Sequence, residues 1–173
     1  MSRYLQTAIN RLNLLDPGQA EKEFLKCCGS GEWAKRMIVE RPFEDFDDLL
    51  AKADHVWWLL EPQDWLEAFQ SHPKIGQKKP EQQTSAESQA WSEQEQSGTR
   101  SSTQKTREAL VALNDVYEEK FGHIFIVCAT GKNSEELLAI LRQRLVNTPE
   151  EELQNAATEQ AKITALRSKK LMS

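Results

Sequence analysis

Residues 16–42 read DPGQAEKEFLKCCGSGEWAKRMIVERP, and this stretch contains start and stop signals for two consecutive helices. Asp16 and Pro17 offer a side-chain cap and a first-turn proline for one helix. Gly29 can end that helix, because glycine accepts the left-handed backbone common after a last helical turn. Ser30 can then cap a second helix. The stretch predicts short helices joined by tight turns.

The same helical pattern extends in both directions from this stretch. Apolar side chains recur three and four positions apart, which is the spacing of one helix face. Prolines and capping boxes add further boundaries, and the helix that starts at Pro62 has to end near His72 because Pro73 follows. We predict an all-α fold, a single compact multi-helix domain spanning residues 1–173 with a long polar active-site loop. The supporting segments are Tyr4 to Leu12, Trp33 to Met37, Leu49 to Leu60, Trp65 to Phe69, Leu110 to Phe121, Asn133 to Glu136 and Thr148 to Glu151.

Two segments depart from this pattern. Residues 74–103 are rich in Gln, Ser, Glu and Lys, with few apolar side chains besides Trp91. We expect a surface loop there that carries a short helix, and long loops in compact domains are often functional. Residues 124–129, with the sequence IFIVCA, are the only stretch that resembles a strand. Because no second strand is available to pair with it, we predict a buried extended connector.

Composition excludes several classes of protein. The 22 Lys and Arg against 27 Asp and Glu give a net charge of −5, which argues against general binding of nucleic acid. The three cysteines, Cys27, Cys28 and Cys128, form neither a disulfide framework nor a CxxC pair, so a reducing compartment is expected and a zinc site is not. Neither a membrane-spanning run nor a secretory signal is evident. We therefore expect a cytoplasmic protein that binds no membrane, nucleic acid or metal.

The three histidines differ in their surroundings. His55 lies off the apolar stripe of its helix and is expected to be solvated, whereas His123 precedes an apolar run and is expected to pack or cap a helix. His72 stands at a helix end, beside a proline and before the polar loop. A histidine held there could act as an acid or base at neutral pH. It could equally serve the helix C-terminus through the dipole.

Two further charged groups are candidates for a site. Glu93 and Glu95 lie in the polar segment beside Trp91, where glutamates are usually solvated, although a tryptophan that fixes the segment would favour a role near His72. Arg167 falls on the inward face of the last helix, after Leu153, Ala156, Gln160 and Ile163. A buried guanidinium needs an anionic partner or a route to water. A structural ion pair and an anion-binding pocket both satisfy that need.

Several ordered motifs together resemble the 2-oxo-4-hydroxy-4-carboxy-5-ureidoimidazoline (OHCU) decarboxylase family. The resemblance covers nearly the whole chain, although some members have Phe-Pro where this chain has His123-Ile124, and the loop after His72 varies in length. The motifs are Ser71-His72-Pro73-Lys74-Ile75-Gly76, Glu95-Gln96-Ser97-Gly98, Phe121-Gly122 leading into Phe125-Ile126-Val127-Cys128-Ala129, and Ile163-Thr164-Ala165-Leu166-Arg167.

The resemblance implies an all-helical enzyme, usually a homodimer, that needs no cofactor. It implies a carboxy-lyase that converts OHCU, a small ureide, to (S)-allantoin and carbon dioxide in the last step of uric acid degradation, part of purine metabolism. His72 corresponds to the acid-base histidine, Glu95 to the catalytic glutamate and Arg167 to an arginine that contacts the substrate. Glu95 is favoured over Glu93 because Gln96 follows it directly. Substrate-contacting positions are Pro73, Ser92, Glu93, Gln94, Gln96, Phe125, Ile126, Val127, Cys128 and Ala129.

Two other functions fit the same residues less well. One is a non-catalytic helical module whose polar loop binds a partner protein. The other is an acid-base lyase or hydrolase that acts on a different ureide. Either alternative would leave the chain without activity on OHCU.

Overall fold

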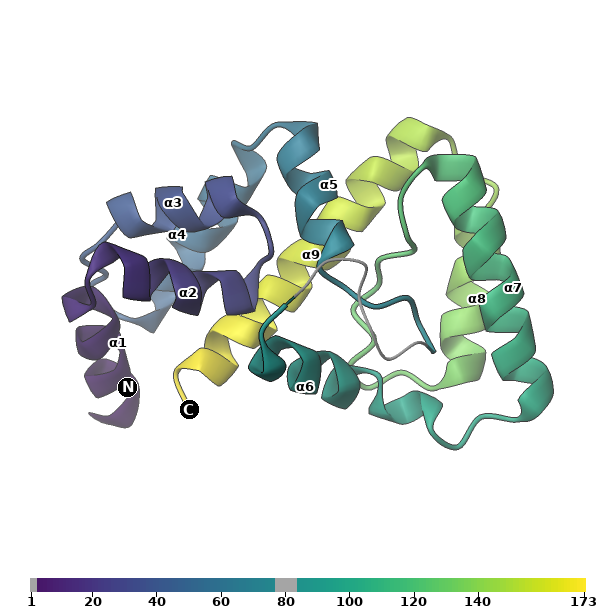
Figure 1. Cartoon of the computed structure of the whole chain (residues 1–173), viewed down its shortest axis with the longest axis horizontal. Coiled ribbons are helices and arrows are strands. Elements are labelled where there is room, and N and C mark those ends of the chain that lie inside the picture. Colours follow the sequence, from purple (N-terminus) through teal and green to yellow (C-terminus); the bar gives the residue numbers. More distant parts are fainter. Residues whose placement is uncertain (1–2, 77–83) are drawn as a thin grey trace. The chain divides into compact units, whose positions relative to one another are not determined.

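A computed structural model describes residues 3–76 and 84–173 of the chain (Figure 1). Within these ranges the chain forms nine α-helices and one short 3₁₀ helix, η1, and no strand. The predicted all-α class is confirmed. No helix in the described part is both long and apolar enough to span a bilayer.

The chain divides into two compact units. Unit 1 comprises Met1–Ala68 with Ala161–Ser173, and unit 2 comprises Phe69–Gln160. The last helix, α9 (Pro149–Leu171), contributes residues to both. The single domain expected over residues 1–173 stays a prediction, and each unit is described by itself below.

Unit 1 contains α1 (Arg3–Leu14), α2 (Pro17–Cys27), α3 (Gly31–Val39), α4 (Phe46–Trp58) and most of α5 (Pro62–Gln70). The predicted caps of α2 and α3 are confirmed, because Asp16 and Ser30 each accept a hydrogen bond from a first-turn backbone N–H. The predicted end of the helix is confirmed, because α2 ends at Cys27 with Cys28 as its C-cap, directly before Gly29. Gly29 does not adopt the left-handed backbone expected of it, because Cys28 already leaves the helix in extended backbone.

The core of unit 1 is aromatic. Phe24 and Trp33 are buried and meet edge to face, with ring centroids 5.9 Å apart. The indole N–H of Trp33 donates to the carbonyl of Ala53 at 3.1 Å, and that of Trp65 donates to the carbonyl of Trp57 at 3.0 Å. These bonds matter because a buried indole N–H without an acceptor would cost stability.

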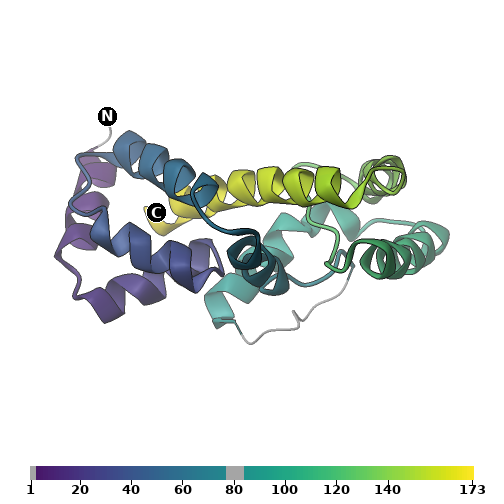
Figure 2. The same cartoon turned by 90° about the horizontal axis from the view of Figure 1, so that it is seen from above.

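Unit 2 contains α6 (Ala86–Glu95), η1 (Ser97–Thr99), α7 (Gln104–Phe121), α8 (Ser134–Arg144) and the first half of α9. Figures 1 and 2 show α7 and α8 side by side. The two helices run in the same direction, because Thr106 bonds Glu135 near their N-termini while Lys120 bonds the carbonyl of Leu145 near their C-termini. A parallel pair requires the chain to travel back between its two helices.

Residues 124–129 make that return. Gly122 ends α7 in the left-handed conformation at φ 75°, which glycine adopts without strain. The six following residues, Ile124 to Ala129, are buried and belong to no helix or strand, so the predicted buried connector is confirmed. Phe125, Val127 and Ala129 pack into the core with Leu110, Leu137 and Leu141. The predicted capping box at Asn133 and Glu136 then starts α8.

Candidate active site

His72 follows the last turn of α5, where the sequence predicted the helix to end. Its backbone N–H donates to the carbonyl of Phe69 at 3.1 Å. Its side chain is 8% exposed, and Nε2 lies 2.7 Å from the Oε1 atom of Gln160, which is fully buried on α9. His72 is therefore a buried, hydrogen-bonded imidazole rather than a solvated helix-terminal group.

Each of the residues 74–76, which follow His72 and Pro73, makes its own contact with another segment of unit 2. Lys74 forms ion pairs with Glu118 and Asp115 of α7, and the bond to Glu118 raises the pKa of Lys74 above its usual value. Ile75 packs into the hydrophobic core. Gly76 adopts φ 87° and donates its N–H to the Oε1 atom of Gln96 at 2.9 Å. The backbone that carries His72 is thus fixed on several sides.

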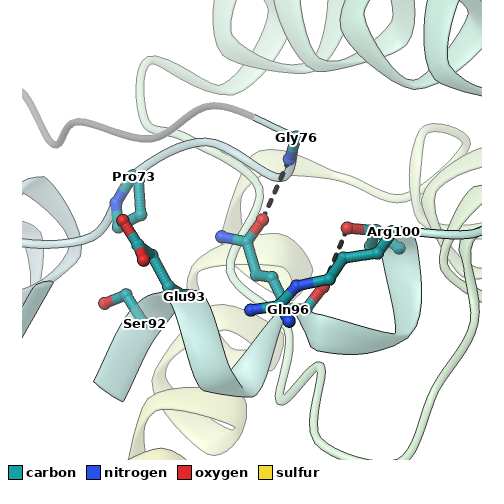
Figure 3. Close-up of a pocket in the computed structure, with 7 residues that line it drawn as sticks. Pro73, Gly76, Ser92, Glu93, Gln96 and Arg100 are labelled. Carbon is teal, nitrogen blue, oxygen red and sulfur yellow. Dashed lines mark hydrogen bonds between the residues drawn. The ribbon is translucent and has the colours of Figure 1, made fainter. Parts of the chain in front are cut away.

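A cavity of about 370 Å³ opens beside this segment (Figure 3). Pro73 and Gly76 line it from the segment after His72, and α6, η1 and the residue after η1 supply the rest of its lining. Among the seven residues drawn in Figure 3, Glu93 and Arg100 are the charged ones, so the cavity presents both signs of charge. The remaining lining residues are Ser92, Gln96 and Thr99.

The short helix expected within the polar segment is α6, and both glutamates lie on it. Ser92 to Glu95 form the last turn of α6, and Gln96 is its C-cap. The sequence does not predict the bounds of this helix, because Ser, Gln and Glu alternate there without an apolar stripe. The part of the predicted loop at residues 77–83 lies outside the described residues.

Helical geometry separates the two candidate glutamates. Residues two positions apart on a helix point about 200° apart. Glu93 is exposed and lines the cavity, whereas Glu95 is partly buried and lies close enough to Cys128 to influence the pKa of its thiol. Gln94, a predicted contact, is exposed. The choice of Glu95 over Glu93 stays a prediction.

The connector is held by its backbone as well as by its side chains. Arg144 donates to the carbonyl of Ile126 at 2.6 Å, and Lys132 donates to the carbonyl of Cys128 at 2.8 Å. The N–H of Cys128 donates to the Oε2 atom of Glu159 at 2.7 Å. Burial raises the pKa of the Cys128 thiol, which disfavours a reactive thiolate.

A buried charged network underlies the connector. The carboxylate of Glu152 accepts hydrogen bonds from Arg144 at 2.7 and 2.8 Å and from the hydroxyl of Tyr117 at 2.5 Å. Asn147 and Asn155 donate to its other oxygen at 2.8 and 3.0 Å. Burial alone would raise the pKa of Glu152, but these donors outweigh burial and lower it. Glu152 is therefore a buried anion with nearly all its acceptor capacity used.

The other two histidines match their predicted roles. His55 is exposed on α4. His123 is buried among the rings of Phe69, Tyr117 and Phe121, and its Nδ1 lies 3.0 Å from the carbonyl oxygen of Ile124. Burial lowers the pKa of His123, so the ring is neutral at pH 7.

Arg167 lies in unit 1, and its predicted inward orientation is confirmed by an exposure of 3%. Its NH1 atom donates to the carbonyl of Lys26 at 3.4 Å, at the C-terminal turn of α2. A cation is favoured at that end of a helix. Cys27 and Cys28 are nearby and buried, and burial raises the pKa of each thiol to about 12. The substrate contact expected of Arg167 stays a prediction.

The sequence reasoning missed Gln160 and Glu159. Gln160 had been counted with the inward row of α9, yet a buried carboxamide, like the buried guanidinium of Arg167, needs a partner. Applying the same argument to Gln160 would have marked it as a candidate. Glu159 gives no such signal, because its bond to the backbone of Cys128 depends on a tertiary contact.

Comparisons with known proteins agree with this geometry. A family model described as OHCU decarboxylase matches residues 13–169. The chain is 39% identical over 155 residues to the uric acid degradation bifunctional protein TTL of Arabidopsis thaliana, a match that covers 88% of this chain and 47% of that protein. The chain therefore spans about half the length of this relative.

Two further matches extend over whole chains. An OHCU decarboxylase from Halalkalicoccus jeotgali is 28% identical over 169 residues, covering 94% of this chain and 93% of that protein. A crystal structure of an OHCU decarboxylase, determined in the presence of (S)-allantoin, superposes with a TM-score of 0.76 at 37% identity. That match covers 87% of this chain and 97% of the other.

Proposed function

Because this chain belongs to the OHCU decarboxylase family, we propose that it converts OHCU to (S)-allantoin and carbon dioxide in the degradation of uric acid. The observation that carries this proposal is the placement of His72. The family's histidine motif lies beside the cavity lined by Pro73, and the imidazole is buried and oriented at 2.7 Å by Gln160. A buried, oriented imidazole suits proton transfer at neutral pH.

The chemistry of the substrate explains why one proton-transfer group can suffice. OHCU carries its carboxylate on a ring carbon that also bears a hydroxyl and adjoins an imine carbon. When the carbon–carbon bond to the carboxylate breaks, its electron pair moves toward the imine, and carbon dioxide leaves. A proton must then reach the former imine carbon while the hydroxyl becomes a carbonyl. Delivery of that proton from one face of the ring gives a single enantiomer of allantoin.

We assign this proton handling to His72, acting on the substrate hydroxyl or on the neighbouring carbon. Glu95 would orient His72 or the ureido group, and its negative charge would disfavour the bound carboxylate. The substrate contacts of Arg167 and of residues 125–129 are proposed from the family resemblance. The backbone N–H of Cys128 already donates to Glu159. We therefore propose that other backbone N–H groups of residues 125–129 donate to the substrate.

A coupled assay tests the activity directly. Uricase and hydroxyisourate hydrolase generate OHCU from urate, and circular dichroism follows the appearance of optically active allantoin after this protein is added. We expect (S)-allantoin to form faster than in the uncatalysed control. If the enantiomeric excess and the rate match that control, the proposed activity is wrong.

Replacing His72 tests the assignment of the proton transfer. We expect His72→Asn to lower kcat by about 10²- to 10⁴-fold, the usual contribution of general acid-base catalysis. The far-ultraviolet circular dichroism should stay helical, because His72 follows the last turn of α5 and lies within no helix. The matched control is His55→Asn, an exposed site on α4 where the rate should not change. Full activity of His72→Asn would remove His72 from the mechanism.

We further propose a homodimer in the cytoplasm. The family's usual assembly supports the dimer, and three buried cysteines without a disulfide fit a reducing compartment. Light scattering coupled to size-exclusion chromatography checks the first point, since a dimer has twice the 19.8 kDa mass of the chain.

A further inference from the structure

Gln160 occupies a position where a polar side chain is costly. The preceding inward residues, Ala156 and Ala157, are fully buried, and Gln160 is fully buried as well. An unpaired buried carboxamide would cost on the order of 1–3 kcal/mol. Gln160 avoids that cost by bonding across the unit to Nε2 of His72, which lies 88 residues earlier in the chain.

The atoms that face each other favour one tautomer of the histidine ring. The Oε1 atom of a carboxamide can only accept a hydrogen bond, so its position 2.7 Å from Nε2 favours the form in which Nε2 carries hydrogen. A neutral imidazole carries one ring hydrogen, and its lone pair then belongs to Nδ1. Glutamine is also uncharged, so it orients the ring without adding a negative charge beside it.

We propose that Gln160 is a positioning residue that fixes the ring orientation of His72 and its Nε2–H tautomer, so that Nδ1 is the basic nitrogen. Only the catalytic consequence of this inference rests on the proposed decarboxylase function. The tautomer itself is a property of the folded chain. Gln160 acts through His72 and is assigned no contact with the substrate.

The backbone around His72 is fixed by other contacts, so the motion that Gln160 restricts is rotation of the imidazole ring. The backbone of His72 is bonded to Phe69, and the residues after it are anchored at Lys74, Ile75 and Gly76. A fixed backbone still permits an imidazole to flip or rotate about its side-chain bonds. A bond at the far nitrogen of the ring suppresses that motion.

The same turn of α9 also holds the connector. Glu159, the neighbour of Gln160, accepts the N–H of Cys128 at 2.7 Å. One short piece of helix therefore positions both the histidine and the extended segment that the family resemblance assigns to the substrate. Because Glu159 and Gln160 are adjacent and bond to distant segments of unit 2, a shift of this turn would displace His72 and the connector together.

The experiment combines nitrogen-15 NMR of the histidine rings with kinetics. At pH 8, where imidazoles are neutral, we expect the wild-type His72 ring to show the Nε2–H tautomer. Gln160→Leu removes the acceptor and should shift the ring toward a mixture of tautomers. It should also lower kcat by about 10- to 100-fold, as loss of an orienting partner commonly does, with KM changed less than threefold. Gln160→Glu keeps an acceptor oxygen and should restore the Nε2–H tautomer.

The matched control is Gln154→Leu, which changes an exposed glutamine of the same helix and should alter neither readout. An Nδ1–H tautomer in the wild type would overturn the inference, and this result requires no variant to fold. A changed tautomer with unchanged kcat would overturn the positioning role. If the wild type does not act on OHCU, the proposed function fails, while the NMR comparison still decides whether Gln160 sets the tautomer.

Discussion

Two buried polar clusters in unit 2 contain a residue of α9, and they are built in opposite ways. Around Glu152, a full negative charge receives donors from Arg144, Tyr117 and two asparagines. Around His72, the Nε2 atom of the ring lies 2.7 Å from the Oε1 atom of an uncharged carboxamide, Gln160. The first cluster stabilises Glu152 as an anion through several donors, whereas the second orients an imidazole through an uncharged partner. The saturated anion suits a structural role, and the oriented imidazole suits proton transfer.

Removing one partner of the charged cluster should have the largest effect on stability. Arg144→Met leaves the carboxylate of Glu152 buried without its cation and frees the carbonyl of Ile126. Breaking a buried pair in this way typically costs about 3–5 kcal/mol. Urea unfolding monitored by circular dichroism measures that loss.

Arg142→Met is the matched control, because Arg142 is exposed on the same helix. Surface substitutions of this kind usually stay within about 0.5 kcal/mol. Equal stability of the two variants would show that the charged cluster does not hold unit 2 together. His72→Asn should lose less stability than Arg144→Met, because no buried charge is left unpaired, while losing far more activity than Arg142→Met.

Substitution of Gly98, which lies in η1 between two residues that line the cavity, should have an intermediate effect. A Cβ atom on Gly98 would overlap the carbonyl oxygen of Lys132, so η1 packs directly on the turn that precedes α8. Gly98→Ala should push η1 away from that turn at a cost of about 1–3 kcal/mol, the usual penalty of overpacking. Gln96 and Thr99, on either side of Gly98, line the cavity. We therefore expect kcat of Gly98→Ala to fall by more than the loss of folded protein alone would explain.

Gly18→Ala is the matched control for Gly98→Ala, because it makes the same substitution where a side chain has room. A Cβ atom there would meet only the Oδ1 atom of Asp16 at 3.5 Å, an ordinary contact in the first turn of α2. This variant should be neutral or more stable by up to about 1 kcal/mol. Urea midpoints and the allantoin assay are measured on both variants. Wild-type activity in Gly98→Ala would separate the packing of η1 from the site.

The same contrast explains what the sequence could and could not predict. The all-helical class, the caps of α2, α3 and α8 and the buried connector follow from local patterns. A short helix in the polar segment is also expected, but its bounds, Ala86 to Glu95, do not follow from the sequence, because no apolar period marks them. The partners of Glu152 and His72 lie on distant segments, and nothing local in the chain encodes those pairings. The order of the family motifs predicts the role of His72. Only the folded structure shows that Gln160 forms a hydrogen bond with it.

The smallest effect on stability is expected from His123, which interacts electrostatically with the charged cluster. His123 is buried, and burial lowers its pKa below the ordinary value of 6.5; the charge of Glu152 raises the pKa and that of Arg144 lowers it. The unfolded chain therefore binds this proton at a higher pH than the folded chain does. The resulting stabilisation is complete above pH 6.5 and is lost as the pH falls toward the folded pKa, with a slope of at most about 1.4 kcal/mol per pH unit.

Urea unfolding at pH 7.5, 6.5 and 5.5 tests this direction. His123→Asn should show a shallower loss of unfolding free energy between pH 6.5 and 5.5 than the wild type, whereas the exposed control His55→Asn should follow the wild type. Arg144→Met, alone and combined with His123→Asn, then tests the electrostatic effect of Arg144 on His123. Arg144 opposes the protonation of His123, so its removal should reduce the pH-dependent contribution of the histidine. Identical slopes for the wild type, His123→Asn, Arg144→Met and the double variant would mean that folding does not lower the pKa of His123.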